Sequence, residues 1–168
     1  MEFFVYGTLT DPATADSLLK SFEYRGTATL RGLRRVDGEY PTLVPGGETT
    51  GRLLVTDDVE TLDRYEGVDG GLYVRIEVPR TDSGCCDSVR PGAKLSLFRR
   101  LKRARSDSTA VHTHNNHYET GENGSNSGVA TYVGHPEKLG VEAEWPGDGP
   151  FSERVRRYVA DNDVVIER

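Results

Sequence analysis

Cysteine, lysine and long apolar runs are all scarce in this chain of 168 residues. Its two cysteines, Cys85 and Cys86, are adjacent, which excludes a disulfide framework and favours a reducing compartment. No stretch approaches the roughly 20 apolar residues that a membrane-spanning helix needs. Residues 1–6 lack the basic start and the small-residue cleavage site of a secretory signal. The composition therefore predicts a cytoplasmic protein with no membrane partner.

Positive charge is also in deficit. The chain carries 27 acidic and 21 basic residues, a formal net charge of -6, which disfavours general binding to nucleic acid. Only four of the basic residues are lysines and the other 17 are arginines. Together with the acid excess, this bias suggests adaptation to high salt, although GC-rich coding would produce the same preference for arginine.

The charge is unevenly distributed along the chain. Residues 80–127 hold eight basic and five acidic groups, which leaves a net charge of -9 on the other 120 residues. The same stretch is rich in serine and asparagine and shows little sustained apolar periodicity, and an ordered loop of that length is unusual inside a compact domain. We therefore predict a single domain over residues 1–168, with a disordered insertion at 81–127 between two strands.

Two motifs inside this insertion have functional alternatives. His112, His114 and His117, with the cysteine pair, could suggest a metal site, but adjacent cysteines lack the usual C-x₂₋₄-C spacing and a solvated polar loop is favoured. The basic run 99–105 could contact nucleic acid or the acidic body of the same protein. Because no aromatic residues interleave with this run, we interpret it as a solvated segment.

Apolar periodicity on either side of the insertion predicts an α+β fold, a mixed sheet or barrel with a few helices. A turn-rich segment at 38–41 and another at 45–47 separate the second and third expected strands. Asp57 and Glu60 have the capping-box spacing at the start of one helix, and Gly67 follows that helix where a C′ glycine belongs. The expected strands are 2–6, 24–36, 50–56, 72–78 and 129–133, and the expected helices are 12–22, 58–66 and 150–161.

Glu66 is the most informative anomaly in the sequence. At about 100° per residue it falls between Val59 and Leu62 on the helical wheel, on the face that should point to the core. Burial raises the pKa of a carboxyl group, and the negative end of the helix dipole acts in the same direction. Glu66 is therefore a candidate general base, although a partly exposed glutamate in a fraying last turn is the alternative.

Tyr6-Gly7-Thr8-Leu9 is the second candidate feature, because it leaves a buried strand and precedes a helix. Glycine allows a sharp turn and close approach of a ligand, and successive N–H groups at such a turn can bind a carboxylate or an oxyanion. A plain strand-to-helix turn is the alternative, since the motif is too short to be diagnostic.

Taken together, these motifs resemble the γ-glutamylcyclotransferase-like (AIG2-like) superfamily. The resemblance rests on the order and approximate spacing of several short segments, and it covers roughly residues 2–79 and 128–135. The segments are Phe4–Leu9, Gly38–Val44, Gly51–Leu53, Leu62–Gly67, Tyr73–Arg75 and, after the insertion, Ala130–Val133.

The resemblance implies a small mixed β-barrel flanked by helices, with a ligand cavity at the loop of residues 6–9. It implies an enzyme that cyclises a small-molecule γ-glutamyl compound to 5-oxoproline and releases an amine or amino acid. Glu66 matches the family's glutamate and would transfer the protons. No metal or organic cofactor is implied, because an intramolecular amine already has a high effective molarity. The residues implied in substrate binding are Tyr6, Gly7, Thr8, Leu9, Tyr73 and Tyr132.

The alternative function is a non-catalytic module of the same fold that binds a ligand, or one whose insertion recruits a partner. The presence of Glu66 favours catalysis. The sequence leaves the leaving group open among γ-glutamylcysteine, glutathione, a γ-glutamyl-amine and an isopeptide, and it leaves the oligomeric state open as well.

Overall fold

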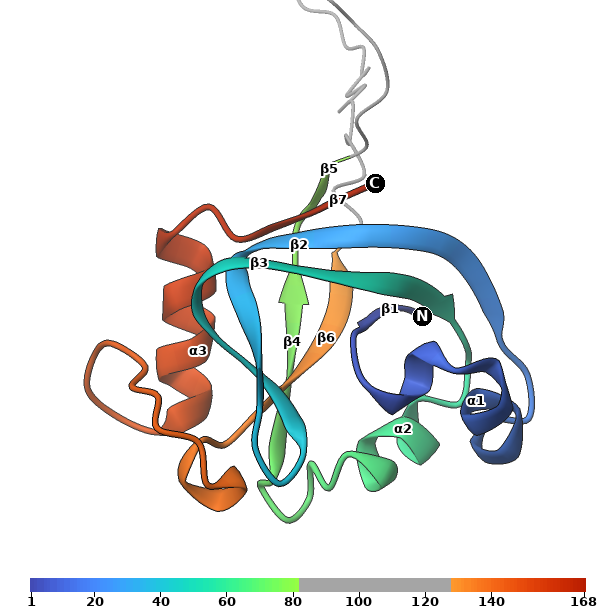
Figure 1. Ribbon diagram of the computed structural model, residues 1–168, viewed down its shortest axis with the longest axis horizontal. Helices are drawn as coiled ribbons and strands as arrows, with labels where there is room; N and C mark the ends of the chain where they lie inside the picture. Colours follow the sequence, from blue (N-terminus) through green and yellow to red (C-terminus); the bar gives the residue numbers. More distant parts are fainter. Residues whose placement is uncertain (82–127) are drawn as a thin grey trace, which may run out of the picture. The chain divides into compact units, whose positions relative to one another are not determined.

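The computed structural model describes residues 1–81 and 128–168, which form seven strands and three α-helices (Figure 1). The predicted insertion, apart from Thr81, lies outside these described residues, and so do its histidines, cysteines and basic run. Within the described ranges, no helix combines the length and the apolar character needed to cross a membrane. The strands are β1 (Glu2–Val5), β2 (Glu23–Asp37), β3 (Pro41–Val55), β4 (Tyr73–Val78), β5 (Arg80–Thr81), β6 (Val129–Gly134) and β7 (Val165–Glu167). The helices are α1 (Pro12–Leu18), α2 (Val59–Tyr65) and α3 (Phe151–Asp161), with short 3-10 turns η1 (Thr8–Thr10) and η2 (Glu137–Leu139).

The strands form one mixed sheet in the order β4-β6-β1-β3-β2-β7-β5. Its two edge strands are consecutive in the chain, because only Pro79 separates β4 from β5. β4 pairs with β6, β5 pairs with β7, and the Ile166 amide donates to the Pro79 carbonyl at 2.9 Å. This one segment therefore joins both edges into a nearly closed barrel, which confirms the predicted α+β barrel with flanking helices.

β1 is buried on both faces, which explains its unbroken apolar sequence. Phe4 and Tyr6 pack in the core that includes α3, whereas Phe3 and Val5 pack in a second core with side chains from α1 and α2. Figure 1 shows α3 on one side of the strands and α1 with α2 on the other. The chain leaving β1 therefore emerges beside α2, which is where the functional candidates lie.

The segment 45–47 was predicted as a turn, and this prediction is wrong. Pro45 pairs with Leu33 and Glu48 pairs with Arg31, so the segment lies inside β3. Two glycines of β3, both with positive φ, oppose the single Gly32 of β2, which makes a β-bulge that bends the long hairpin around the barrel. The turn of the hairpin lies in the other predicted segment, 38–41, of which Pro41 already pairs with Asp37 as the first residue of β3.

The start of α2 also differs from the prediction. Asp58, not Asp57, is the N-cap residue, and no side-chain hydrogen bond caps the helix there. The Asp58 carboxylate instead accepts a hydrogen bond from the Lys20 amide at 2.8 Å, so it links α2 to the end of α1. α1 begins as predicted, with Asp11 capping the Thr14 amide at 3.2 Å, but it ends earlier, at Leu18.

Candidate active site

A cavity of about 300 Å³ opens between the end of β1, the β2–β3 turn and the end of α2. Every residue that the sequence singled out for catalysis or substrate binding lines this cavity. The lining residues are Phe4, Val5, Tyr6, Gly7, Thr8, Leu9, Tyr40, Pro41, Tyr65, Glu66, Leu72, Tyr73 and Tyr132.

Glu66 supplies the one charged side chain among these lining residues. It is the C-cap residue of α2, and the chain reverses immediately after it at Gly67, where φ is +66°. Two hydrogen bonds complete this Schellman motif, from the Gly67 amide to the Arg64 carbonyl and from the Val68 amide to the Asp63 carbonyl. The predicted C′ glycine is therefore confirmed, and it fixes the backbone next to Glu66.

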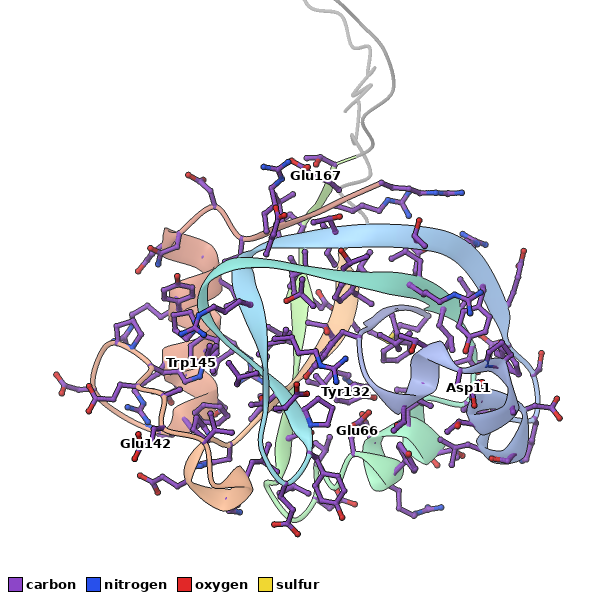
Figure 2. The ribbon with its side chains drawn as sticks, viewed as in Figure 1. Asp11, Glu66, Tyr132, Glu142, Trp145 and Glu167 are labelled. Carbon is purple, nitrogen blue, oxygen red and sulfur yellow. The ribbon has the colours of Figure 1, made fainter. Side chains whose placement is uncertain are left out.

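The Glu66 carboxylate is partly buried and accepts no hydrogen bond from the described residues. Burial raises its pKa from 4.5 to about 7, because the charged form loses hydration without gaining a partner. Figure 2 shows Glu66 and Tyr132 in the same region, between α2 and the crossing strands β4 and β6. A carboxyl group with this pKa can both accept and donate a proton near neutral pH, as general acid–base catalysis requires.

Three tyrosines surround this carboxylate, and each donates its phenol proton to a protein acceptor. Tyr6 donates to the Tyr132 carbonyl at 2.7 Å, Tyr73 to the Pro41 carbonyl at 2.6 Å, and Tyr132 to a carboxylate oxygen of Asp63 at 2.8 Å. Burial raises the pKa of all three phenols, and the charge of Glu66 adds to the effect. The phenols therefore stay protonated, and their oxygens are left to accept hydrogen bonds from a ligand.

The loop after β1 has free donors on its backbone. The amides of Gly7, Thr8 and Leu9 donate no hydrogen bond to any described residue, as is usual at the start of a helical turn. A side chain at position 7 would lie 3.3 Å from the ring of Pro41, so glycine allows this loop to approach the hairpin turn closely. The three amides are thus available for an acceptor such as a carboxylate.

The carbonyl side of the same loop is held by surrounding side chains. Arg35 donates to the Tyr6 carbonyl at 3.0 Å, Tyr24 to the Leu9 carbonyl at 2.6 Å, and Arg52 to the Thr10 carbonyl at 2.9 Å. The Arg52 guanidinium also stacks 3.7 Å above the Tyr24 ring. These contacts keep the loop in one conformation, so its free amides are pre-organised.

Some features of the site were not predicted from the sequence. Tyr40 and Tyr65 line the mouth of the cavity and are 53% and 46% exposed, and the Tyr65 hydroxyl lies 3.1 Å from the Thr8 hydroxyl. Both tyrosines lie in segments that resemble the family, Gly38–Val44 and Leu62–Gly67. The apolar periodicity of the sequence did not indicate that they would be exposed at a cavity. Asp63 and Arg75, which form an ion pair at 2.6 Å behind Tyr132, were likewise missed.

No site for a metal ion is evident in the described ranges, where no three His, Cys, Asp or Glu side chains are grouped closely enough to ligate one. The polar groups that line the cavity are one carboxyl group, five phenols, the Thr8 hydroxyl and a row of backbone amides.

Comparison with known proteins defines the class of this barrel. Residues 3–91 match the family model described as gamma-glutamyl cyclotransferase, AIG2-like. The chain belongs to this family, and the match includes the loop after β1, α2 and Glu66. Resemblance to the same superfamily was the prediction from the sequence motifs, and it is confirmed.

The individual relatives share about a quarter to a third of their residues with this chain over the matched parts. AIG2-like protein A from Arabidopsis thaliana is 34% identical over 80 residues, which cover 45% of this chain and 48% of that protein, so the chain spans about half the length of this curated relative. A solved structure titled gamma-glutamyl cyclotransferase is 23% identical over 47% of this chain and 56% of its own, with a TM-score of 0.44. A solution structure of another Arabidopsis thaliana protein is 24% identical over 90% of this chain and 78% of its own, also with a TM-score of 0.44.

Proposed function

We propose that this protein converts a γ-glutamyl compound into 5-oxoproline and a free amine or amino acid, with Glu66 as the general acid–base. One observation carries the proposal: a carboxyl group with a pKa of about 7, which accepts no hydrogen bond from the described residues, lies in a cavity that phenols, free backbone amides and apolar side chains line. Membership of the cyclotransferase family supports the same reaction class.

Glu66 first removes a proton from the α-ammonium group of the substrate. The freed amine attacks the γ-carbonyl carbon, a new C–N bond closes the five-membered ring, and the bond from that carbon to the leaving nitrogen breaks. Over the whole reaction the attacking nitrogen loses two of its three protons and the leaving nitrogen gains two. Glu66 carries them one at a time and ends ionised, so water, oxidant and reductant are all unnecessary.

The loop of residues 7–9 holds the substrate in this proposal. Its free amides suit either the α-carboxylate of the glutamyl unit or the oxyanion that develops on the γ-carbonyl oxygen. Tyr6, Tyr73 and Tyr132 face the ammonium group as hydrogen-bond acceptors. Ring closure is intramolecular, so the amine already has a high effective molarity and the site has only to hold it facing the carbonyl.

The proposal is tested by incubating the full chain with γ-glutamylcysteine, glutathione, γ-glutamyl-amines and ε-(γ-glutamyl)lysine, and by measuring 5-oxoproline. Production from any of these compounds supports the enzyme and identifies the leaving group. Saturable binding of a γ-glutamyl compound without 5-oxoproline would show instead that the protein is a ligand-binding module.

Substitution Glu66→Gln tests the assigned residue. Glutamine keeps the size of the side chain but cannot accept the substrate proton, so turnover should fall by about 10²–10⁴-fold, the usual contribution of general acid–base catalysis. Glu77→Gln is the matched control, because Glu77 is exposed on β4 and does not line the cavity. Near-normal 5-oxoproline production by Glu66→Gln would exclude the mechanism.

A further inference from the structure

Asp63 lies one helical turn before Glu66, at the junction of α2 with the barrel wall. One of its carboxylate oxygens accepts the Tyr132 phenol proton at 2.8 Å, and the other accepts a hydrogen bond from the Arg75 guanidinium at 2.6 Å. The Asp63 side chain is 24% exposed. A single carboxylate thus receives two donors and forms a partly shielded ion pair.

The two donors come from adjacent strands. Arg75 of β4 and Tyr132 of β6 are directly opposite each other in the antiparallel pair. Asp63 therefore ties α2, and with it Glu66, to both strands that form the wall behind the cavity. The Tyr132 ring is held from its other side by stacking on Phe3, with centroids 5.8 Å apart and planes within 6°.

The direction of the Tyr132 proton matters because this phenol lines the same cavity as Glu66. Burial, the hydrogen bond to Asp63 and the nearby Glu66 charge all raise the pKa of Tyr132, so the phenol always carries its proton. The charges of both Asp63 and Glu66 act on this phenol, and among the described residues Asp63 is the one that accepts its proton. If it went to Glu66, it would stabilise the ionised form of the base and lower its pKa.

We propose that Asp63 is a positioning residue: it takes the Tyr132 proton away from Glu66, and so leaves Glu66 unpartnered and the phenol oxygen available as an acceptor for the ammonium group of the substrate. This inference rests on the proposed function for its catalytic consequence, but the direction of the phenol proton is independent of turnover. Arg75 balances the Asp63 charge and holds the carboxylate in place.

The decisive measurement is a ¹³C NMR titration of the Glu66 carboxyl group, assigned by comparison with Glu66→Gln. In Asp63→Asn the Tyr132 proton loses its charged acceptor and is free to turn to Glu66, so the Glu66 midpoint should fall by about one pH unit. In the Tyr132→Phe background, Asp63→Asn should lower the midpoint by less than half as much. Glu60→Gln, an exposed substitution on the same helix, is the control and should leave the midpoint unchanged.

Kinetics provide the second readout. Asp63→Asn should lower kcat/KM about tenfold, the effect of losing a hydrogen bond to a charged group, and the loss should not multiply with that of Tyr132→Phe because the two residues act as a unit. Equal effects of Asp63→Asn on the Glu66 midpoint in both backgrounds, or none in either, would overturn the inference.

Tyr132→Phe alone keeps the inference testable if Asp63→Asn does not fold. A marked rise of the Glu66 midpoint in this variant would mean that the phenol already donates to Glu66 in the native protein, which would overturn the inference, whereas an unchanged midpoint supports it. Absence of 5-oxoproline from every substrate would refute the proposed function and leave these titrations to decide the role of Asp63.

Discussion

The ionised form of Glu66, which the proposed reaction needs, destabilises the folded protein. The Glu66 carboxylate is partly buried and accepts no hydrogen bond within residues 1–81 and 128–168, so it gives up hydration without compensation, and for that reason its pKa moves to about 7. In an ordinary core such a position would be apolar. The neighbouring Asp63, by contrast, has two donors, so its charge is compensated by Arg75 and Tyr132.

This cost predicts how Glu66→Gln changes stability with pH. The raised pKa means that the folded protein holds a proton on Glu66 between about pH 4.5 and 7 that the unfolded chain has released, so native stability falls across this range and the full penalty is present above it. Glutamine has no such penalty. The stability of Glu66→Gln relative to the native protein should therefore increase from pH 4.5 to 8, by at most about 3 kcal/mol.

Chemical denaturation at several pH values measures this difference. Glu77→Gln, at an exposed position, should show no comparable trend. A constant difference between Glu66→Gln and the native protein across the range would mean that Glu66 is not desolvated in solution.

Some residues of the site could be predicted from the sequence and others could not. Glu66 and the loop of residues 6–9 could be found because a charged residue on an apolar helix face and a glycine after a buried strand are local patterns. Asp63 and Arg75 could not, because an Asp on a helix and an Arg on the polar face of a strand are common, and their pairing depends on how α2 docks on the barrel. Local patterns identify the candidate carboxyl group, whereas tertiary contacts determine which side chains surround it.

Among the helices and strands, the bounds were predicted most accurately where the apolar residues of an element lie on a single face. α3 matches its predicted bounds because Phe151, Val155 and Val159 recur at helical spacing and are all buried. The long hairpin was harder, because the bulge at residues 45–47 has the glycine and proline of a turn but lies inside β3. β7, with three residues, and β5, with two, are too short to show any periodicity. They are strands because β5 pairs with β7 and β7 pairs with β2.

The glycine that ends α2 predicts how a substitution there affects stability. Gly67 has φ of +66°, and an added Cβ would lie 3.3 Å from the Leu72 side chain. Gly67→Ala should therefore destabilise the fold by about 1–2 kcal/mol, since alanine disfavours this conformation. Because the same turn places Glu66, 5-oxoproline production should fall by more than the loss of folded protein explains.

Gly70→Ala is the matched control for this substitution. Gly70 lies in the same turn without a positive φ, and an added Cβ would meet only the Gly67 carbonyl oxygen at 3.6 Å. Thermal unfolding and activity measured on both variants separate backbone strain from a general effect of added bulk. Equal stability of the two variants would show that the conformation at Gly67 does not hold the end of α2.

At the scale of the whole molecule, we propose that residues 1–81 and 128–168 fold as a single domain without the segment between them. The barrel is joined at both borders of that segment, because Thr81 pairs with Glu167 in β5 and Val129 pairs with Val78 in β6. The predicted insertion begins at Thr81, and this boundary is wrong because Thr81 belongs to the sheet. Linking Thr81 to Gly128 by a short flexible turn should give a protein that unfolds cooperatively, since loop closure depends only weakly on length.

Limited proteolysis of the full chain offers an independent check, because the first cuts should fall between about residues 84 and 126. If the shortened protein were insoluble or lost cooperative unfolding, the segment would be part of the core. If it folded but no longer bound or converted a γ-glutamyl compound, the segment would contribute to the site.

The net charge predicts how the molecule responds to salt. The full chain has a net charge of -6, whereas the chain without residues 82–127 has 14 basic and 22 acidic groups, a net charge of -8. Like charges destabilise a compact state, and raising the salt from 0.01 M to 1 M shortens the screening length from about 30 Å to about 3 Å. The melting temperature should therefore rise with sodium chloride in both proteins, and more steeply in the shortened one. A flat or falling melting temperature would remove the inference of adaptation to high salt and leave the excess of arginine over lysine as a consequence of codon composition.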